Sequence, residues 1–162
     1  MKKCCIIGHR KIETNNDLLQ NLRSIIIDLI ENKKVNIFMF GSKSMFSSVC
    51  YNIVTDLKYT YKNIKRIYVR AEYPNISDEY EKYLHNFYED TWFFDDNCNA
   101  GKLNYIKRNE AMIDCCDLCL FFYNKEYIPP SNTRSGTALA YKYAVEKKKI
   151  VINLYQCKGT PV

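Results

Sequence analysis

Short apolar runs alternate with longer amphipathic stretches along most of this chain, and this alternation restricts the fold more than any other feature. The runs have the length of buried strands, and the stretches between them repeat apolar side chains at helical spacing. Parallel strands are joined by long crossovers, usually helices, which cover both faces of the sheet. The pattern therefore predicts an α/β fold: a Rossmann-like, doubly wound parallel sheet of about five strands with helices on both faces.

The ends of the apolar runs set the boundaries of the predicted elements. The predicted strands are the runs 4–7, 35–40, 66–71, 117–123 and 149–154. The predicted helices are the stretches 17–32, 46–58, 102–115 and 136–147. Residues 75–101 do not follow this alternation, and we expect there an irregular insertion that is either a lid or binding loop or a region of local packing. Within it we expect a helix at 78–85 and an extended piece near 92–94.

Length and composition limit the class of protein. With 162 residues, 47% of them hydrophobic, the chain suits one domain spanning 1–162. No apolar run approaches the roughly 20 residues of a membrane span, and the first residues lack a signal-peptide pattern. We therefore expect a cytoplasmic protein with no membrane partner. Single-stranded nucleic acid is an alternative partner because 14 tyrosines would suit stacking, but the net charge of +6 forms no local basic stripe.

Eight cysteines could indicate a disulfide scaffold, but four of them are expected to be buried. Cys4, Cys5, Cys116 and Cys119 fall in or beside predicted strands, where a thiol behaves as a small hydrophobe. Cys116 and Cys119 have C-x-x-C spacing, but the sequence has no second pair at zinc-site spacing and only two histidines. We expect neither a metal nor a cofactor.

Small and polar residues follow several predicted strands, and the carboxyl ends of parallel strands meet at one edge of a sheet, where open α/β folds bind ligands. These segments are 8–10, 41–44, 72–73 and 134–137. The last of them also opens a predicted helix, whose first N–H groups are unpaired and favour an anion. The sequence therefore predicts a site for a phosphate or a ribose at this edge.

Several side chains at this edge have a specific predicted role. Arg108 would present its guanidinium to a phosphate if Met112, one helical turn later, packs inward; the alternative is a surface salt bridge. Ser135 and Thr137 would clamp a phosphate or ribose, although Ser135 also suits a helix N-cap. His9 would contact a phosphate or transfer a proton, or else lie in a solvated turn. The candidate ligand-binding residues are Gly8, His9, Arg10, Gly41, Ser42, Arg108, Asn109, Arg134, Ser135, Gly136 and Thr137.

Four segments carry a resemblance to a known family. They are Cys5-Ile6-Ile7-Gly8-His9-Arg10, Phe40-Gly41-Ser42, Arg108-Asn109-Glu110-Ala111-Met112-Ile113-Asp114, and Ser135-Gly136-Thr137-Ala138 with Tyr143-Ala144. Together they resemble the SLOG superfamily, which includes the lonely-guy phosphoribohydrolases and the DprA-type DNA-processing proteins, and most of all its small YpsA-like bacterial branch. The resemblance implies a Rossmannoid sensor or regulatory module that binds a nucleotide or nucleotide-derived ligand at the strand ends and associates into homo-oligomers.

The chain departs from the phosphoribohydrolases at the glutamate that follows their Gly-Thr turn, because Leu139 and Ala140 stand there. Neither side chain can stabilise the charge that develops when an N-glycosidic bond breaks. Binding without catalysis is therefore the leading interpretation. The alternative is a hydrolase or transferase acting on an N-glycosidic bond, similar to the nucleoside deoxyribosyltransferases, with Glu72, Asp95 or Asp96 as its carboxylate.

Overall fold

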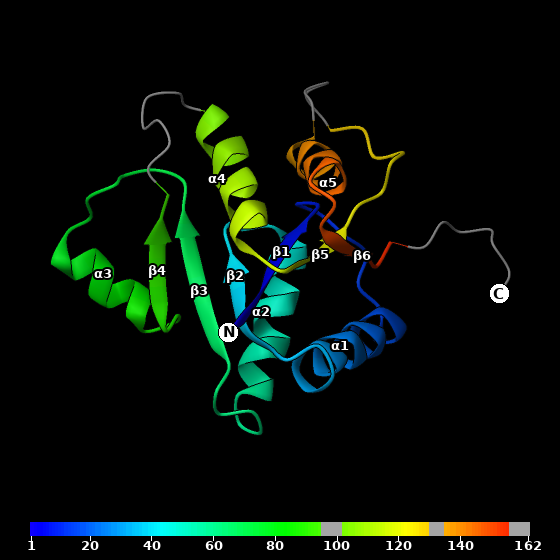
Figure 1. The fold of residues 1–162 in the computed structure, drawn as a ribbon, viewed down its shortest axis with the longest axis horizontal. Helices are drawn as coiled ribbons and strands as arrows, with labels where there is room; N and C mark the ends of the chain where they lie inside the picture. The colour runs from blue at the N-terminus through cyan, green and yellow to red at the C-terminus, as the bar shows by residue number, and fades with distance from the viewer. Residues whose placement is uncertain (95–101, 130–134, 156–162) are drawn as a thin grey trace, which may run out of the picture.

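The computed structural model describes residues 1–94, 102–129 and 135–155, which form a parallel sheet with helices on both faces (Figure 1). The strands are β1 (Lys2–Gly8), β2 (Val35–Phe40), β3 (Lys65–Arg70), β4 (Asp90–Phe93), β5 (Leu118–Phe122) and β6 (Ile150–Asn153). The helices are α1 (Asn16–Glu31), α2 (Met45–Leu57), α3 (Asp78–His85), α4 (Lys102–Cys115) and α5 (Gly136–Glu146). No helix in these ranges is long and apolar enough to cross a membrane.

The strands are ordered β4-β3-β2-β1-β5-β6, and every neighbouring pair is parallel. The chain runs outward from β1 to β4 and then continues on the other side of β1, so the winding reverses between β1 and β5. The predicted Rossmann-like fold is confirmed, with six strands where about five were predicted, because the extended piece expected near 92–94 overlaps a strand that pairs with the sheet. The additional strand is β4, which pairs with β3 at the edge of the sheet and is only partly buried.

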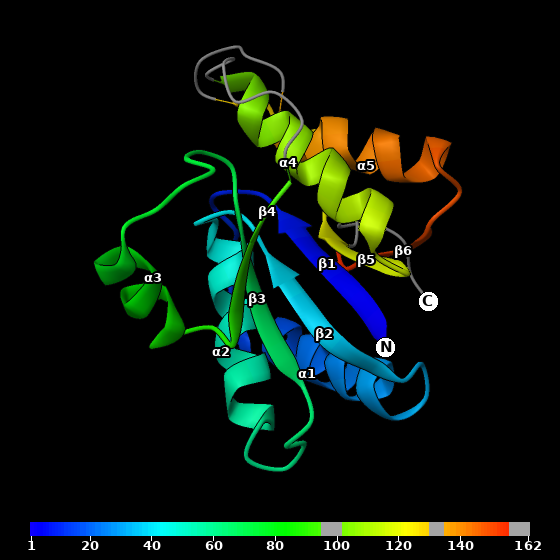
Figure 2. The same cartoon turned by 60° about the vertical axis from the view of Figure 1, so that its left-hand side comes forward.

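Helices lie on both faces of the sheet (Figure 2), and a cluster of buried hydrophobic side chains packs between the sheet and each helical layer. Side chains alternate along β1, so Cys4 and Ile6 face the layer of α1 and α2, whereas Cys5 and Ile7 face the layer of α4 and α5. All four are buried. Helices thus cover both faces, and polar groups of the strand ends remain available only at the two edges where the strands begin and end.

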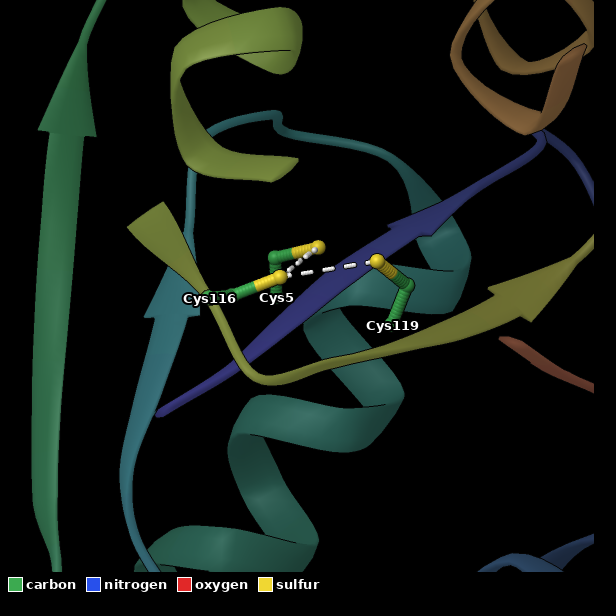
Figure 3. Close-up of side chains that lie close together, drawn as sticks. All are labelled: Cys5, Cys116 and Cys119. Atoms are coloured by element: carbon green, nitrogen blue, oxygen red, sulfur yellow. Dashed lines mark hydrogen bonds between the residues drawn. The ribbon is translucent and has the colours of Figure 1, made fainter. Parts of the chain in front are cut away.

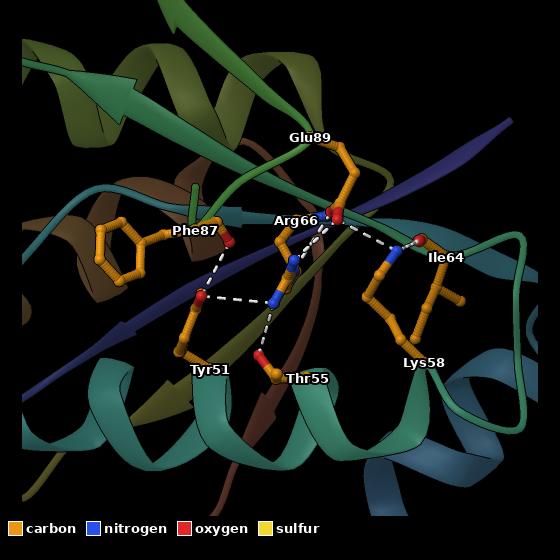
Figure 4. Close-up of polar contacts among 7 residues, drawn as sticks. All are labelled: Tyr51, Thr55, Lys58, Ile64, Arg66, Phe87 and Glu89. Atoms are coloured by element: carbon orange, nitrogen blue, oxygen red, sulfur yellow. Dashed lines mark hydrogen bonds and ion pairs between the residues drawn. The ribbon is translucent and has the colours of Figure 1, made fainter. Parts of the chain in front are cut away.

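Arg66 and Glu89 attach the α3–β4 segment to the rest of the sheet (Figure 4). The Arg66 guanidinium donates to Glu89 at 2.7 Å, and the Arg66 backbone N–H donates to the same carboxylate at 2.6 Å. Lys58 adds an ion pair at 3.1 Å. On the far side of the guanidinium, Thr55 and Tyr51 accept hydrogen bonds at 2.8 and 3.3 Å. Residues 75–94 are therefore held in place by a polar network.

Glu89→Gln is expected to lower the free energy of unfolding by about 1–3 kcal/mol at neutral pH, because it removes charge-assisted hydrogen bonds. Burial works to raise the pKa of Glu89, but the bonds from Arg66 and Lys58 outweigh it and lower that pKa to about 2. The contribution is therefore present above the ordinary pKa of 4.5 and is lost as the pH falls toward 2.

Urea unfolding of both proteins between pH 7 and pH 2 measures this effect. Asp56→Asn is the matched control, because Asp56 pairs with Arg23 at 2.5 Å but is 58% exposed, and such a pair contributes about 0–1 kcal/mol. An equal effect of the two substitutions, or a Glu89 effect that persists at pH 2, would contradict this account of the network.

Candidate ligand-binding site

The loops that follow β1 and β2 lie side by side at the edge of the sheet where the strand arrows end and α4 and α5 begin (Figure 1). The backbone N–H of Met45 donates to the Arg10 carbonyl at 3.0 Å, which fixes one loop against the other. Gly8 lies against the ring of Phe46 so closely that an added Cβ would come within 2.3 Å of it. Glycine is therefore required at this position for the first turn of α2 to approach β1.

Arg108 on α4 is buried at this edge, with only 6% of its surface exposed. It donates from Nη1 to the Gly41 carbonyl and from Nε to Asn109 Oδ1 at 3.2 Å, and its guanidinium lies 5.5 Å from the ring centre of Tyr105. Met112 packs inward and is fully buried, as the proposed orientation of Arg108 requires. Within the described ranges, Arg108 forms no ion pair with a carboxylate, so the surface salt bridge is absent there.

The surroundings of Arg108 are poor at stabilising its charge. Burial lowers the pKa of its guanidinium to about 10, although the tyrosines Tyr68 and Tyr105 act in the opposite direction. The stem of Arg108 crosses Gly41, where an added Cβ would lie 2.7 Å from Nε. Gly41 thus permits a buried cation to reach the end of β2. An anion bound beside it would offset the cost of removing this charge from water.

Three serine hydroxyls gather where the loop after β2 enters α2. Ser42, Ser44 and Ser47 have their Oγ atoms 3.0–3.1 Å from one another, and Ser44 Oγ also accepts from the Ser47 backbone N–H. Ser44 is the N-cap of α2. Arg10 and Lys43 on the same two loops are exposed, and neither forms an ion pair with a carboxylate in the part of the chain that the structure describes. This corner of the site combines hydroxyls, a helix N-terminus and cations.

The first turn of α5 supplies the last predicted segment. Ser135 Oγ accepts from the Ala138 N–H at 3.3 Å, so the N-cap alternative for Ser135 is the one realised. Thr137 is buried, whereas Gly136 is exposed and an added Cβ would meet nothing within 4 Å. Packing therefore does not explain the glycine. Arg134 lies outside the described residues.

His9 fastens the loop after β1 to the segment after β5. It is 3% exposed, and its Nε2 accepts from the Asn124 backbone N–H at 2.9 Å, while its ring lies 4.4 Å from that of Tyr127. Burial lowers the pKa of His9, and Nε2 carries no proton because it accepts the Asn124 N–H. His9 is therefore neither in a solvated turn nor free to transfer a proton through Nε2, and it holds the loop after β1 against the segment after β5.

Glu72, just after β3, accepts a hydrogen bond from the Tyr105 hydroxyl at 2.7 Å. Tyr105 therefore links Glu72 to Arg108, although sequence reasoning did not single it out. The i, i+3 spacing of Tyr105 and Arg108 on one helix is the signal that would have identified it. Leu139 and Ala140 bring no carboxylate to the start of α5. Asp95 and Asp96, the other carboxylate candidates, lie outside the described residues.

Comparisons with known proteins support the fold more than the function. No protein-family model matches this sequence, and no curated protein matches it. Among solved structures, the chain is similar to DNA processing protein A from Helicobacter pylori, studied for its mode of binding single-stranded DNA. The TM-score is 0.59 at 14% sequence identity, over 98% of this chain and 67% of that chain. At this identity the likeness shows the fold alone.

Proposed function

We propose that this protein binds a nucleotide or nucleotide-derived ligand through its phosphate at the carboxyl edge of the sheet, as a sensor or regulatory module. The observation that carries the proposal is Arg108, a guanidinium that is 6% exposed and has no carboxylate partner in the described ranges. A folded protein keeps a buried cation at a cost unless an anion balances it. A phosphate also accepts two parallel N–H bonds from a guanidinium, one at each of two of its oxygens.

The neighbouring groups suit the same ligand. The start of α2 supplies the Ser42 hydroxyl and the positive end of a helix dipole, which favours phosphate. Arg10 and Lys43 add exposed positive charge on the loops beside it. Gly136 leaves open space at the start of α5, where a ligand can approach the backbone closely.

Calorimetric titration with a 5′-mononucleotide, the matching nucleoside and inorganic phosphate tests this function. We expect the mononucleotide to bind and to raise the melting temperature, and the nucleoside to bind at least about 10-fold more weakly, since it lacks the charge-assisted bonds. Equal affinity for nucleoside and nucleotide, or no binding of either, would overturn the proposal.

The enzymatic alternative makes a separate prediction. With Leu139 and Ala140 at the start of α5 and Glu72 engaged by Tyr105, we expect no free base when the protein is incubated with nucleoside monophosphates or NAD. Chromatography of the reaction measures it. Base release that is lost in Glu72→Gln and retained in Glu79→Gln, a control on exposed α3, would replace the binding function with N-glycosidic bond cleavage.

Single-stranded DNA is the second candidate ligand, favoured by the likeness to a protein studied for that activity. Tyr80, Tyr83 and Phe87 on and after α3 are 41%, 55% and 43% exposed and offer rings on which bases can stack. Salt-dependent retention of a fluorescent oligonucleotide measures this binding. Competition by a mononucleotide would place the strand in the proposed site, whereas retention without competition would favour a separate surface.

A further inference from the structure

Three cysteine sulfurs meet in the core on the α4–α5 side of the sheet (Figure 3). Cys116 Sγ lies 3.5 Å from Cys5 Sγ and 3.5 Å from Cys119 Sγ, and all three sulfurs lie within 4.8 Å of one another. The three residues are 0–3% exposed. The site is thus built from one C-x-x-C pair and a third thiol that is distant in the chain.

The sheet register brings this third thiol into place. Cys5 on β1 and Cys119 on β5 are direct partners in adjacent parallel strands, so their side chains leave the same face of the sheet. Cys116 immediately follows α4, in the turn that leads into β5, and points at both of them in Figure 3. Three elements of the core therefore fix the three sulfurs before any ion binds.

A positive charge lies next to the cluster. Lys149 donates from Nζ to the Cys116 carbonyl and to the Asp114 carbonyl, each at 2.9 Å. Two anchors of this kind hold the ammonium group close to the backbone of Cys116. The Lys149 ammonium, which lies 2.9 Å from the Cys116 carbonyl, stabilises negative charge on the nearby sulfurs because the interior has a low dielectric constant.

We propose that Cys5, Cys116 and Cys119 bind a soft metal ion with three-coordinate geometry, Cu(I), as thiolates. Each thiol loses its proton as its sulfur bonds to the ion, so binding releases up to three protons and transfers no electron. An ion with metal–sulfur bonds of about 2.3 Å in a trigonal plane holds its sulfurs ~4 Å apart, within the spread of the sulfur positions here.

The donor set distinguishes Cu(I) from other thiophilic metals. Thiolates select Cu(I), zinc and iron–sulfur clusters, but structural zinc takes four protein ligands in a tetrahedron and common iron–sulfur clusters take four cysteines. In the described ranges, no fourth cysteine, histidine or carboxylate joins this group. The sequence alone predicts no metal here, because Cys5 is more than a hundred residues from the C-x-x-C pair and joins it only in the fold.

Anaerobic titration with Cu(I) tests the site in a variant with Cys98→Ser and Cys157→Ser, since these two thiols lie outside the described residues. We expect one copper per chain, an ultraviolet thiolate-to-copper absorption band, and three sulfur neighbours at about 2.3 Å by X-ray absorption. Less than one copper per folded chain, or a four-coordinate ion, would overturn the proposal.

Substitutions locate the bound copper. Cys5→Ser or Cys119→Ser, checked for folding by circular dichroism, is expected to weaken copper binding by roughly 100-fold or more, since even outer-shell changes cost 10–100-fold. Cys4→Ser is the matched control, because Cys4 is equally buried on the same strand but faces the opposite layer. Equal copper affinity in all three variants would place the metal elsewhere and refute the site. If the serine variants do not fold, the sulfur count of the unsubstituted cluster decides.

Discussion

Arg108→Met is expected to weaken binding of a 5′-mononucleotide by about 10- to 150-fold, the loss that corresponds to one or more hydrogen bonds to a charged group. The same substitution is expected to leave the free energy of unfolding within about 1 kcal/mol of its original value or to raise it. Methionine is apolar and of similar length, and it removes a cation whose pKa is lowered by burial. The exchange is therefore expected to weaken ligand binding without lowering the stability of the ligand-free protein by more than about 1 kcal/mol.

Calorimetry and urea unfolding of the same preparations measure the two effects. Lys107→Met is the matched control, because it removes an equal charge from the neighbouring position of α4, which is less buried. We expect it to change nucleotide affinity less than about 3-fold, as a screened surface charge does. Arg108→Lys retains the charge without the planar fork, and it separates the two contributions of the guanidinium.

Two results would contradict the assigned role of Arg108. Unchanged nucleotide affinity in Arg108→Met would mean that the ligand does not contact this side chain. A large loss of stability with unchanged affinity would mean that Arg108 is a structural residue whose bond to the Gly41 carbonyl holds α4 against β2. The first result would overturn the proposed function, because that function depends on contact between Arg108 and the phosphate.

The fold could be predicted from the sequence because several strands contain a run of apolar residues, such as 4–7 in β1, 37–40 in β2 and 118–122 in β5, and amphipathic stretches lie between them. The predicted strand 35–40 and the element β2 coincide, and α4 has its predicted bounds of 102–115. β4 was less visible because it is a short edge strand that mixes Asp90 and Thr91 with aromatic residues. Its aromatic residues therefore indicated an extended piece near 92–94 but not a strand paired with the sheet.

For the candidate site, the sequence predicted which loops meet at the carboxyl edge of the sheet, but not the contacts that their residues make there. Its contacts depend on residues that are distant in the chain, such as Arg108 with Gly41 and His9 with Asn124. Whether His9 is solvated or buried is decided by the segment after β5, which no local pattern indicates. The cysteine cluster could not be predicted for the same reason: Cys5 is distant from the C-x-x-C pair in the chain and is brought to it by the strand register.

Gly8→Ala and Gly136→Ala are expected to have opposite consequences, although both glycines lie at the candidate site. At Gly8 the new methyl would lie 2.3–2.7 Å from three atoms of Phe46, a fully buried ring. Overpacking of this kind costs about 1–3 kcal/mol, or roughly 2–12 °C in melting temperature for a chain of this size. At Gly136 the methyl meets no atom, and alanine stabilises a helix start by up to about 1 kcal/mol.

Gly136→Ala is expected to weaken ligand binding even though it does not destabilise the protein. If the nucleotide approaches the first turn of α5, the methyl of Gly136→Ala occupies space that the ligand needs, and we expect affinity to fall about 10-fold while the melting temperature holds or rises. Thermal unfolding with and without the mononucleotide measures both quantities in one experiment. Undiminished nucleotide affinity in Gly136→Ala would mean that the ligand does not occupy the space beside Gly136. The ligand would then lie on the Arg108 and α2 side of the edge.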